Sequence, residues 1–193
     1  MKFKKLLLVL ATIALTFQLQ LVHAANPKVK METSKGTIII ELYADKAPKS
    51  VANFLSYVNA GAYDGTIFHR VIKDFMNQGG GFTPDYNKVD TKDPVQNEAD
   101  NGLKNLKYTV AMARTGEPHS ATNQFFINTA DNAFLDYTGK SMRGWGYTVF
   151  GNVIEGQNIA DIISRAATGS GGPFSKDVPR TPIIIEKMTE IKQ

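Results

Sequence analysis

The segment from Phe68 to Thr83 combines residue types that could bind a polar group inside an apolar pocket. It contains Arg70, the large apolar residues Phe75 and Met76, and Gln78, which precedes three consecutive glycines. A guanidinium carries several N–H donors in a fixed fork and stays charged at every relevant pH. Glycine leaves the backbone unobstructed, so another chain can approach it closely. The segment therefore favours hydrogen bonding and apolar contact with a ligand.

The sequence disfavours several other chemistries. It has no cysteine, and His69 and His119 are the only histidines after residue 24. No close set of histidines and carboxylates has metal-ligand spacing, no Gly-x-Ser-x-Gly motif is present, and the glycine run is not followed by Lys-Ser or Lys-Thr. The acids Glu98 and Asp100 fit an exposed polar loop better than a catalytic pair. We expect neither a metal nor a cofactor.

The residues around Arg70 must be positioned by a strand. Alternation over residues 66–72 places successive side chains on opposite faces of a sheet. Arg70 then shares its face with Phe68 and Ile72. His69 lies on the other face, where we expect a packed or hydrogen-bonded structural side chain. The alternative is that Arg70 lies on a solvated sheet face without a chemical role, but its apolar neighbours disfavour this.

A second predicted strand repeats the combination of an amide and an aromatic side chain. Within residues 123–128, Gln124 and Phe126 fall on one face. Taken singly, each aromatic residue would more often belong to a core than to a binding site. Because they occur together with Arg70 and Gln78, we interpret the two segments as halves of one site.

The rest of the chain alternates strand patterns with two helical ones, without a repeat or a linker. Strands dominate, which predicts a mainly antiparallel β protein, either a closed barrel or a sandwich, with two amphipathic helices. Residues 82–107 predict a long ordered loop, and residues 169–173 break the pattern. Strands are expected near residues 29–33, 37–42, 66–72, 109–113, 124–128, 148–153 and 183–185, and helices near 51–58 and 159–163.

The first 24 residues have the composition of a secretory signal peptide. A lysine-rich start precedes the apolar run Leu6–Phe17, and Val22 and Ala24 form the small or aliphatic site that places cleavage after Ala24. The alternative is an uncleaved membrane anchor, but Gln18 and Gln20 interrupt the run before the roughly 20 apolar residues that a spanning helix needs. We therefore expect a signal peptide over residues 1–24 and one domain over residues 25–193.

Export would leave a nearly neutral protein. The leader holds three lysines and no acid, so its removal lowers the formal net charge from +4 to +1. This gives no basis for nucleic-acid binding, which requires a concentrated basic surface. The absence of cysteine suits an oxidising compartment. We expect a periplasmic monomer that does not bind membranes after processing, with secretion or surface attachment as alternatives.

Six motifs resemble those of the cyclophilin family of peptidyl-prolyl isomerases, and most of all those of its exported bacterial branch. The resemblance covers nearly all of the chain after the first two dozen residues. The motifs are FHRVIKDFMNQGGGFT (68–83), NEADNGLKN (97–105), TVAMAR (109–114), SATNQFFIN (120–128), FLD (134–136) and YTVFGNVIEG (147–156). By this resemblance, the fold is an eight-stranded antiparallel closed barrel, capped by a helix at each end, with a substrate groove on its outer face.

The resemblance also implies a function and a set of site residues. The substrates would be proline-containing peptide segments, and Arg70 would be the catalytic residue that donates a hydrogen bond near the prolyl nitrogen. The proline ring would enter an apolar pocket. Gln78 and the backbone near Ala113 and Arg114 would bind the peptide, and Gln124 would support Arg70 or the bound carbonyl. The residues implied for the pocket are Phe75, Met76, Phe126 and Leu135.

Three positions depart from the eukaryotic pattern of the family. Phe134 stands where many relatives have tryptophan, so an indole N–H donor is missing and weak or no cyclosporin binding is expected. Tyr147 replaces a histidine at the pocket, and Arg114 replaces an asparagine. A second function stays open, namely a proline-peptide binding module or chaperone whose isomerase turnover is incidental.

Overall fold

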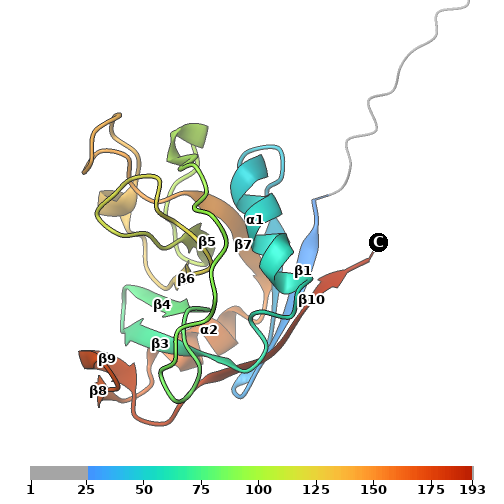
Figure 1. The fold of residues 1–193 in the computed structure, drawn as a ribbon, viewed down its shortest axis with the longest axis vertical. Coiled ribbons are helices and arrows are strands. Elements are labelled where there is room, and N and C mark those ends of the chain that lie inside the picture. Colours follow the sequence, from blue (N-terminus) through green and yellow to red (C-terminus); the bar gives the residue numbers. More distant parts are fainter. Residues whose placement is uncertain (1–25, 193) are drawn as a thin grey trace, which may run out of the picture.

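The computed structural model describes residues 26–192 of the chain, which form one closed β-barrel (Figure 1). The signal peptide predicted for residues 1–24, with cleavage before Ala25, lies outside these residues. Neighbouring strands follow the order β1-β10-β3-β4-β6-β5-β7-β2, and all pairs are antiparallel. The predicted eight-stranded barrel is thereby confirmed. Its strands are β1 (Lys28–Thr33), β2 (Gly36–Leu42), β3 (Thr66–Ile72), β4 (Met76–Gly79), β5 (Thr109–Met112), β6 (Phe125–Asn128), β7 (Val149–Glu155) and β10 (Ile184–Ile191).

Two helices cover separate parts of the barrel (Figure 1). Helix α1 (Pro48–Val58) starts at a proline, which suits the first turn because a helix leaves its first N–H groups unpaired. Helix α2 (Gln157–Ser164) follows Gly156, whose φ of 82° favours glycine. Helix α1 buries the apolar face that its periodicity predicted, whereas α2 buries Ile163 but leaves Ile162 exposed, although the two were predicted on one apolar face. No helical segment within residues 26–192 combines the length and the apolar character needed to cross a membrane.

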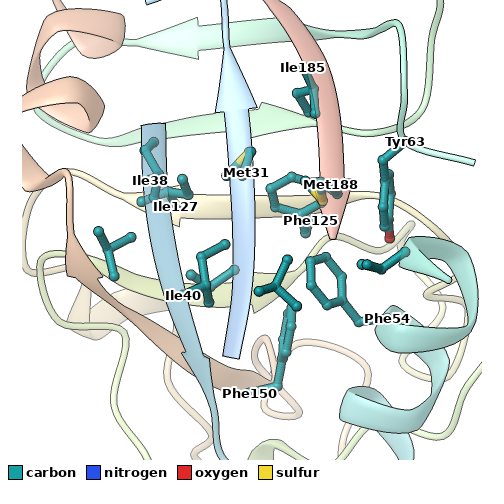
Figure 2. Close-up of a cluster of buried hydrophobic side chains, with 14 of the residues drawn as sticks. Met31, Ile38, Ile40, Phe54, Tyr63, Phe125, Ile127, Phe150, Ile185 and Met188 are labelled. Atoms are coloured by element: carbon teal, nitrogen blue, oxygen red, sulfur yellow. The ribbon is translucent and has the colours of Figure 1, made fainter. Parts of the chain in front are cut away.

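The barrel interior is filled with side chains (Figure 2). The ring of Phe54 from α1 lies 5.5 Å from that of Phe125 on β6 and 5.1 Å from that of Phe150 on β7. These rings are fully buried and pack in tilted or edge-on geometries, which favour aromatic contacts. A binding site therefore has to lie on the outer face of the sheet.

Four strands were not predicted as the structure has them. Strand β4 was not predicted as a separate strand, and β10 extends well beyond the three residues expected. The predicted break at residues 169–173 contains the turn of a small hairpin, β8 (Thr168–Gly171) and β9 (Phe174–Pro179). Glycine is required in this turn because a Cβ atom at Gly172 would lie 2.2 Å from Cγ of Tyr86. The loop over residues 82–107 is confirmed, apart from the short helix η1 (Ala99–Asn101) and two isolated bridges.

The predicted face of Phe68 is wrong. The pairing of β3 with β4 shifts register between Phe68 and Arg70, which marks a β-bulge. A bulge inserts one extra residue and so reverses the alternation beyond it. Phe68 and Val71 belong to the core cluster inside the barrel, whereas Ile72 joins an apolar cluster on the outer face. Arg70 thus lies on the outer face without Phe68 beside it.

His69 is packed in an aromatic pocket, as its position in the strand predicted. Its ring lies 4.8 Å from that of Phe82 and 5.5 Å from that of Phe174, and only 2% of the residue is exposed. Burial, which disfavours the charged imidazolium, lowers the pKa of His69 to about 4. The folded barrel therefore holds His69 mainly in its neutral form above that pH.

We expect His69 to make the barrel less stable in acid. Between pH 6.5 and 4 the unfolded chain binds the His69 proton and the folded chain does not, so the free energy of unfolding falls as the pH is lowered. The loss attributable to this residue should reach about 3 kcal/mol near pH 4. The measurement is urea unfolding of wild type and His69→Phe from pH 7 to 4. The wild type should lose more stability than the variant, and parallel curves would contradict this account.

Candidate active site

Strand register brings the two predicted halves of the site together on the outer face of the barrel. Arg70 on β3 pairs with Gln78 on β4, and Gln78 pairs in turn with Phe126 on β6. The next strand continues the row with Ala111 opposite Phe126. Side chains in register on one face of a sheet are close neighbours. Arg70, Gln78 and Phe126 of this row border a pocket of about 100 Å³. Its lining residues are Arg70, Phe75, Met76, Gln78, Ala113, Arg114, Phe126, Leu135 and Tyr147.

All the predicted pocket residues therefore meet, and the two remaining predicted residues lie beside them. Gln124 lies outside the pocket lining and accepts a hydrogen bond from Gln78. Phe134 stacks on Phe75 at a ring distance of 5.5 Å and is 75% exposed, so it forms part of the rim rather than the wall.

A row of polar side chains positions Arg70. Gln78 Nε2 donates a hydrogen bond to Gln124 Oε1 at 2.9 Å, which leaves Gln78 Oε1 to accept one from Arg70 Nη1 at 3.5 Å. Among residues 26–192, no carboxylate lies within ion-pair distance of Arg70. The guanidinium is half-buried, and most of its N–H groups have no partner in the described chain. It can therefore donate hydrogen bonds to a ligand in the pocket.

The apolar wall is held by a short helix and by the amide side chains behind it. Helix η2 (Ala133–Leu135) presents Leu135, and Asn132 at its start donates from Nδ2 to the Phe75 carbonyl at 2.9 Å. Asn105 Nδ2 donates to the Leu135 carbonyl at 3.2 Å. These amides fix both sides of the wall. Sequence reasoning missed them because buried asparagines look like ordinary loop residues until the fold is known.

Arg114 and Tyr147 form another side of the pocket. The Arg114 guanidinium lies 4.6 Å from the centre of the Tyr147 ring, and its Nε donates to the Gly146 carbonyl at 2.8 Å. The Tyr147 ring meets that of Phe126 edge-on at 5.7 Å. The backbone N–H of Ala113 already donates to the Gln124 carbonyl at 2.9 Å, so of its two backbone polar groups only the carbonyl could bind a peptide.

The absence of a side chain at Gly81 leaves the space that the Gln124 side chain occupies. A Cβ atom at residue 81 would lie 2.6 Å from both Cγ and Cδ of Gln124, far inside contact distance. We expect Gly81→Ala to displace Gln124, loosen Gln78 and lower kcat/KM toward a proline peptide about tenfold, because misplacing a positioning group costs catalysis.

The matched control for this prediction is Gly139→Ala, since no atom lies within 4 Å of a Cβ at that glycine. Gly81→Ala combined with Gln124→Ala should be no less active than Gln124→Ala alone, because the displaced side chain is then absent. Independent, multiplicative losses in the double variant would show that Gly81 acts by another route.

Comparison with known proteins identifies the family. The model of the cyclophilin type peptidyl-prolyl cis-trans isomerase family matches residues 28–190. The chain is 61% identical over 158 residues to peptidyl-prolyl cis-trans isomerase cyp18 of Streptomyces antibioticus, covering 82% of this chain and 95% of that protein. It is 53% identical over 161 residues to peptidyl-prolyl cis-trans isomerase B of Escherichia coli, covering 83% and 98%. The chain belongs to the cyclophilin family.

The fold comparison agrees with this assignment. A crystal structure of a cyclophilin type isomerase from Cryptosporidium parvum matches with a TM-score of 0.69 at 26% identity, covering 87% of this chain and 99% of that one. The same protein in the presence of the dipeptide Ala-Pro matches with a TM-score of 0.67 at 25% identity. The activity of this cyclophilin is peptidyl-prolyl cis-trans isomerisation.

The cyclophilin site offers hydrogen-bond donors and apolar walls. Within the described residues, no three histidine, aspartate or glutamate side chains gather as a metal site would require. A second hollow of about 130 Å³ adjoins the pocket on the Gln78 side, and sequence reasoning did not identify its outer wall of Thr115, Ser120 and Thr122. In the sequence alone, scattered Ser and Thr residues in a loop do not indicate that they line the same hollow.

Proposed function

We propose that this cyclophilin accelerates rotation about X-Pro bonds with Arg70 as its catalytic residue. The observation that carries the proposal is the placement of the half-buried Arg70 guanidinium, held by Gln78, at the wall of the apolar pocket. Proline-containing peptide segments would bind with the ring against Phe126 and Leu135. No covalent bond has to break, which agrees with a site built of donors and apolar groups.

The chemistry follows from amide resonance. Rotation about the peptide bond costs roughly 18–20 kcal/mol because resonance keeps the amide planar. In the twisted state the prolyl nitrogen becomes pyramidal and regains a lone pair. Arg70 would donate to this lone pair, and the apolar walls would strengthen the interaction by excluding water. Only the twisted amide gains this hydrogen bond, which lowers the barrier rather than merely binding the substrate.

A coupled assay tests the proposal. The protein beginning at Ala25 is mixed with an Ala-Pro peptide, and a protease that cleaves only the trans isomer reports the rate of isomerisation. We expect a rate well above the uncatalysed one. An unchanged rate would refute the proposal, whereas tight peptide binding with a negligible rate would favour a binding module with incidental turnover.

We further propose that the enzyme acts on exported proteins in the periplasm. Support comes from the leader-like composition of residues 1–24 and from the absence of cysteine in the chain. Fractionation of cells, followed by sequencing of the N-terminus, should find the protein in the periplasm starting at Ala25. An intact Met1 in the cytoplasm would contradict this, and recovery from the medium or the cell surface would change only the final location.

A further inference from the structure

A wide hollow continues the proline pocket on the side of Arg114. It measures about 730 Å³ and shares Arg114 and Tyr147 with the proline pocket. An extended peptide advances about 3.3 Å per residue, so a substrate seated in the pocket would reach this hollow within about three residues of its proline. The remaining lining residues are Thr115, Gly116, Met142 and Arg143.

Arg114 is a fixed positive charge at the border of the two hollows. Its Nε donates to the Gly146 carbonyl at 2.8 Å and its Nη1 to the Thr115 carbonyl at 2.9 Å, while the guanidinium stacks on Tyr147. All these partners are neutral, and among residues 26–192 no carboxylate pairs with Arg114. No ion pair with the described residues therefore neutralises the Arg114 guanidinium, and its Nη2 has no hydrogen-bond partner in the described chain. A preorganised guanidinium of this kind recognises carboxylates.

Arg143 adds a second unpaired cation from the loop over residues 136–146, the orange loop at the upper left of Figure 1. It is exposed and makes no ion pair with the described residues. The loop is anchored below its tip, because the Trp145 ring packs at 4.8 Å on His119 and at 5.6 Å on Tyr137. Its tip thus presents a charge and, at Met142, an apolar side chain that is 59% exposed.

The acid that directly follows Gly116 in the sequence does not neutralise the two arginines. Glu117 lies in the same turn as Thr115 and Gly116, but its carboxylate is not within ion-pair distance of either arginine. We propose that the hollow is a specificity subsite that binds an acidic side chain near the proline of the substrate peptide. This proposal rests on the proposed function, because the same peptide must occupy the proline pocket.

Peptides that differ at one position test the subsite. Each carries Ala-Pro at its centre and a single Glu, Gln or Lys at one of the three positions before or after this pair. Isomerisation by the protein beginning at Ala25 is measured by NMR exchange at low and at high salt. At one or two positions, Glu should raise kcat/KM about 3- to 10-fold over Gln, and Lys should lower it. The preference should shrink at high salt.

Charge reversal tests the assignment to Arg143. Arg143→Glu places a carboxylate in the lining that Arg143 shares with Arg114, so the Glu-over-Gln ratio should fall to about one or below. The control is Arg165→Glu, which makes the same change at a 69% exposed residue directly after α2. That variant should keep the wild-type ratio, because it alters net charge equally but lies outside the lining of the hollow.

The outcomes separate the two proposals. Equal rates for Glu and Gln peptides at every position would overturn the subsite and leave the proposed isomerase function intact. Absence of catalysis with the Gln peptides would overturn the proposed function itself. An equal loss of preference in Arg165→Glu and Arg143→Glu would mean that net charge alone is sensed, and the subsite would again be refuted.

Discussion

Arg70→Ala is expected to lower kcat/KM toward an Ala-Pro peptide about 100- to 1000-fold. Removing one preorganised donor that acts on the transition state typically costs about 2.7–4 kcal/mol, and Arg70 is the charged donor on the β3 side of the pocket. The loss should fall mainly on kcat, because in the proposed mechanism the planar ground state does not use this hydrogen bond. Stopped-flow kinetics with the protease-coupled assay provides both constants.

Two controls separate chemistry from folding in this prediction. Arg70→Lys keeps the charge but lacks the planar fork, so we expect it to stay at least about tenfold below wild type. The free energy of unfolding should change little in both variants, since Arg70 is only half-buried and forms no ion pair with the described residues. A Lys variant as active as wild type would show that positive charge suffices. An Ala variant within threefold of wild type would remove Arg70 from the mechanism.

Phe125→Ala should mainly lower stability and Phe126→Ala should mainly lower activity, although the two residues are adjacent on β6. Phe125 is fully buried inside the barrel, with ring centres of Phe54 and Tyr63 both 5.5 Å away (Figure 2). We expect Phe125→Ala to cost about 3–5 kcal/mol of stability, because it leaves a cavity in a close-packed core. Urea unfolding measures this loss directly.

Phe126→Ala removes a wall of the pocket instead. The proposed contact with a proline ring would be lost, and burial of such a group contributes about 1.5–3 kcal/mol, so kcat/KM should fall about 10- to 100-fold. Its cost in stability should be smaller, about 1–2 kcal/mol, since one side of the ring borders the open pocket. Equal losses of stability in the two variants, or a larger loss of activity in folded Phe125→Ala, would contradict the assignment of the two faces.

Much of the site could be predicted because its residues form short motifs on neighbouring strands. Arg70, Gln78 and Phe126 occupy paired positions in the barrel, so their shared face follows once the strands are placed in register. The bulge between Phe68 and Arg70 could not be predicted, because alternation assumes an uninterrupted ladder. The role of Gly81 was also hidden, since it depends on a side chain more than forty residues away.

The fold class depended on the family resemblance, because the β pattern alone left a barrel and a sandwich open. Strand β4 has only four residues, and half of them are Asn77 and Gly79, which carry little strand propensity. The hairpin β8–β9 is rich in glycine and packs beside β3 rather than joining the barrel. Both were missed because tertiary contacts stabilise them against weak local preference.

Exchange NMR of an Ala-Pro peptide at saturating enzyme tests the central claim most directly, because it observes isomerisation of bound peptide without a coupling protease. For the protein beginning at Ala25, we predict cis–trans exchange cross-peaks at mixing times below a second, whereas free peptide needs tens of seconds or longer. Arg70→Ala should still bind the peptide, as shown by shifts of pocket resonances, but lose these cross-peaks. Bound peptide that exchanges as fast on Arg70→Ala as on wild type would contradict the account.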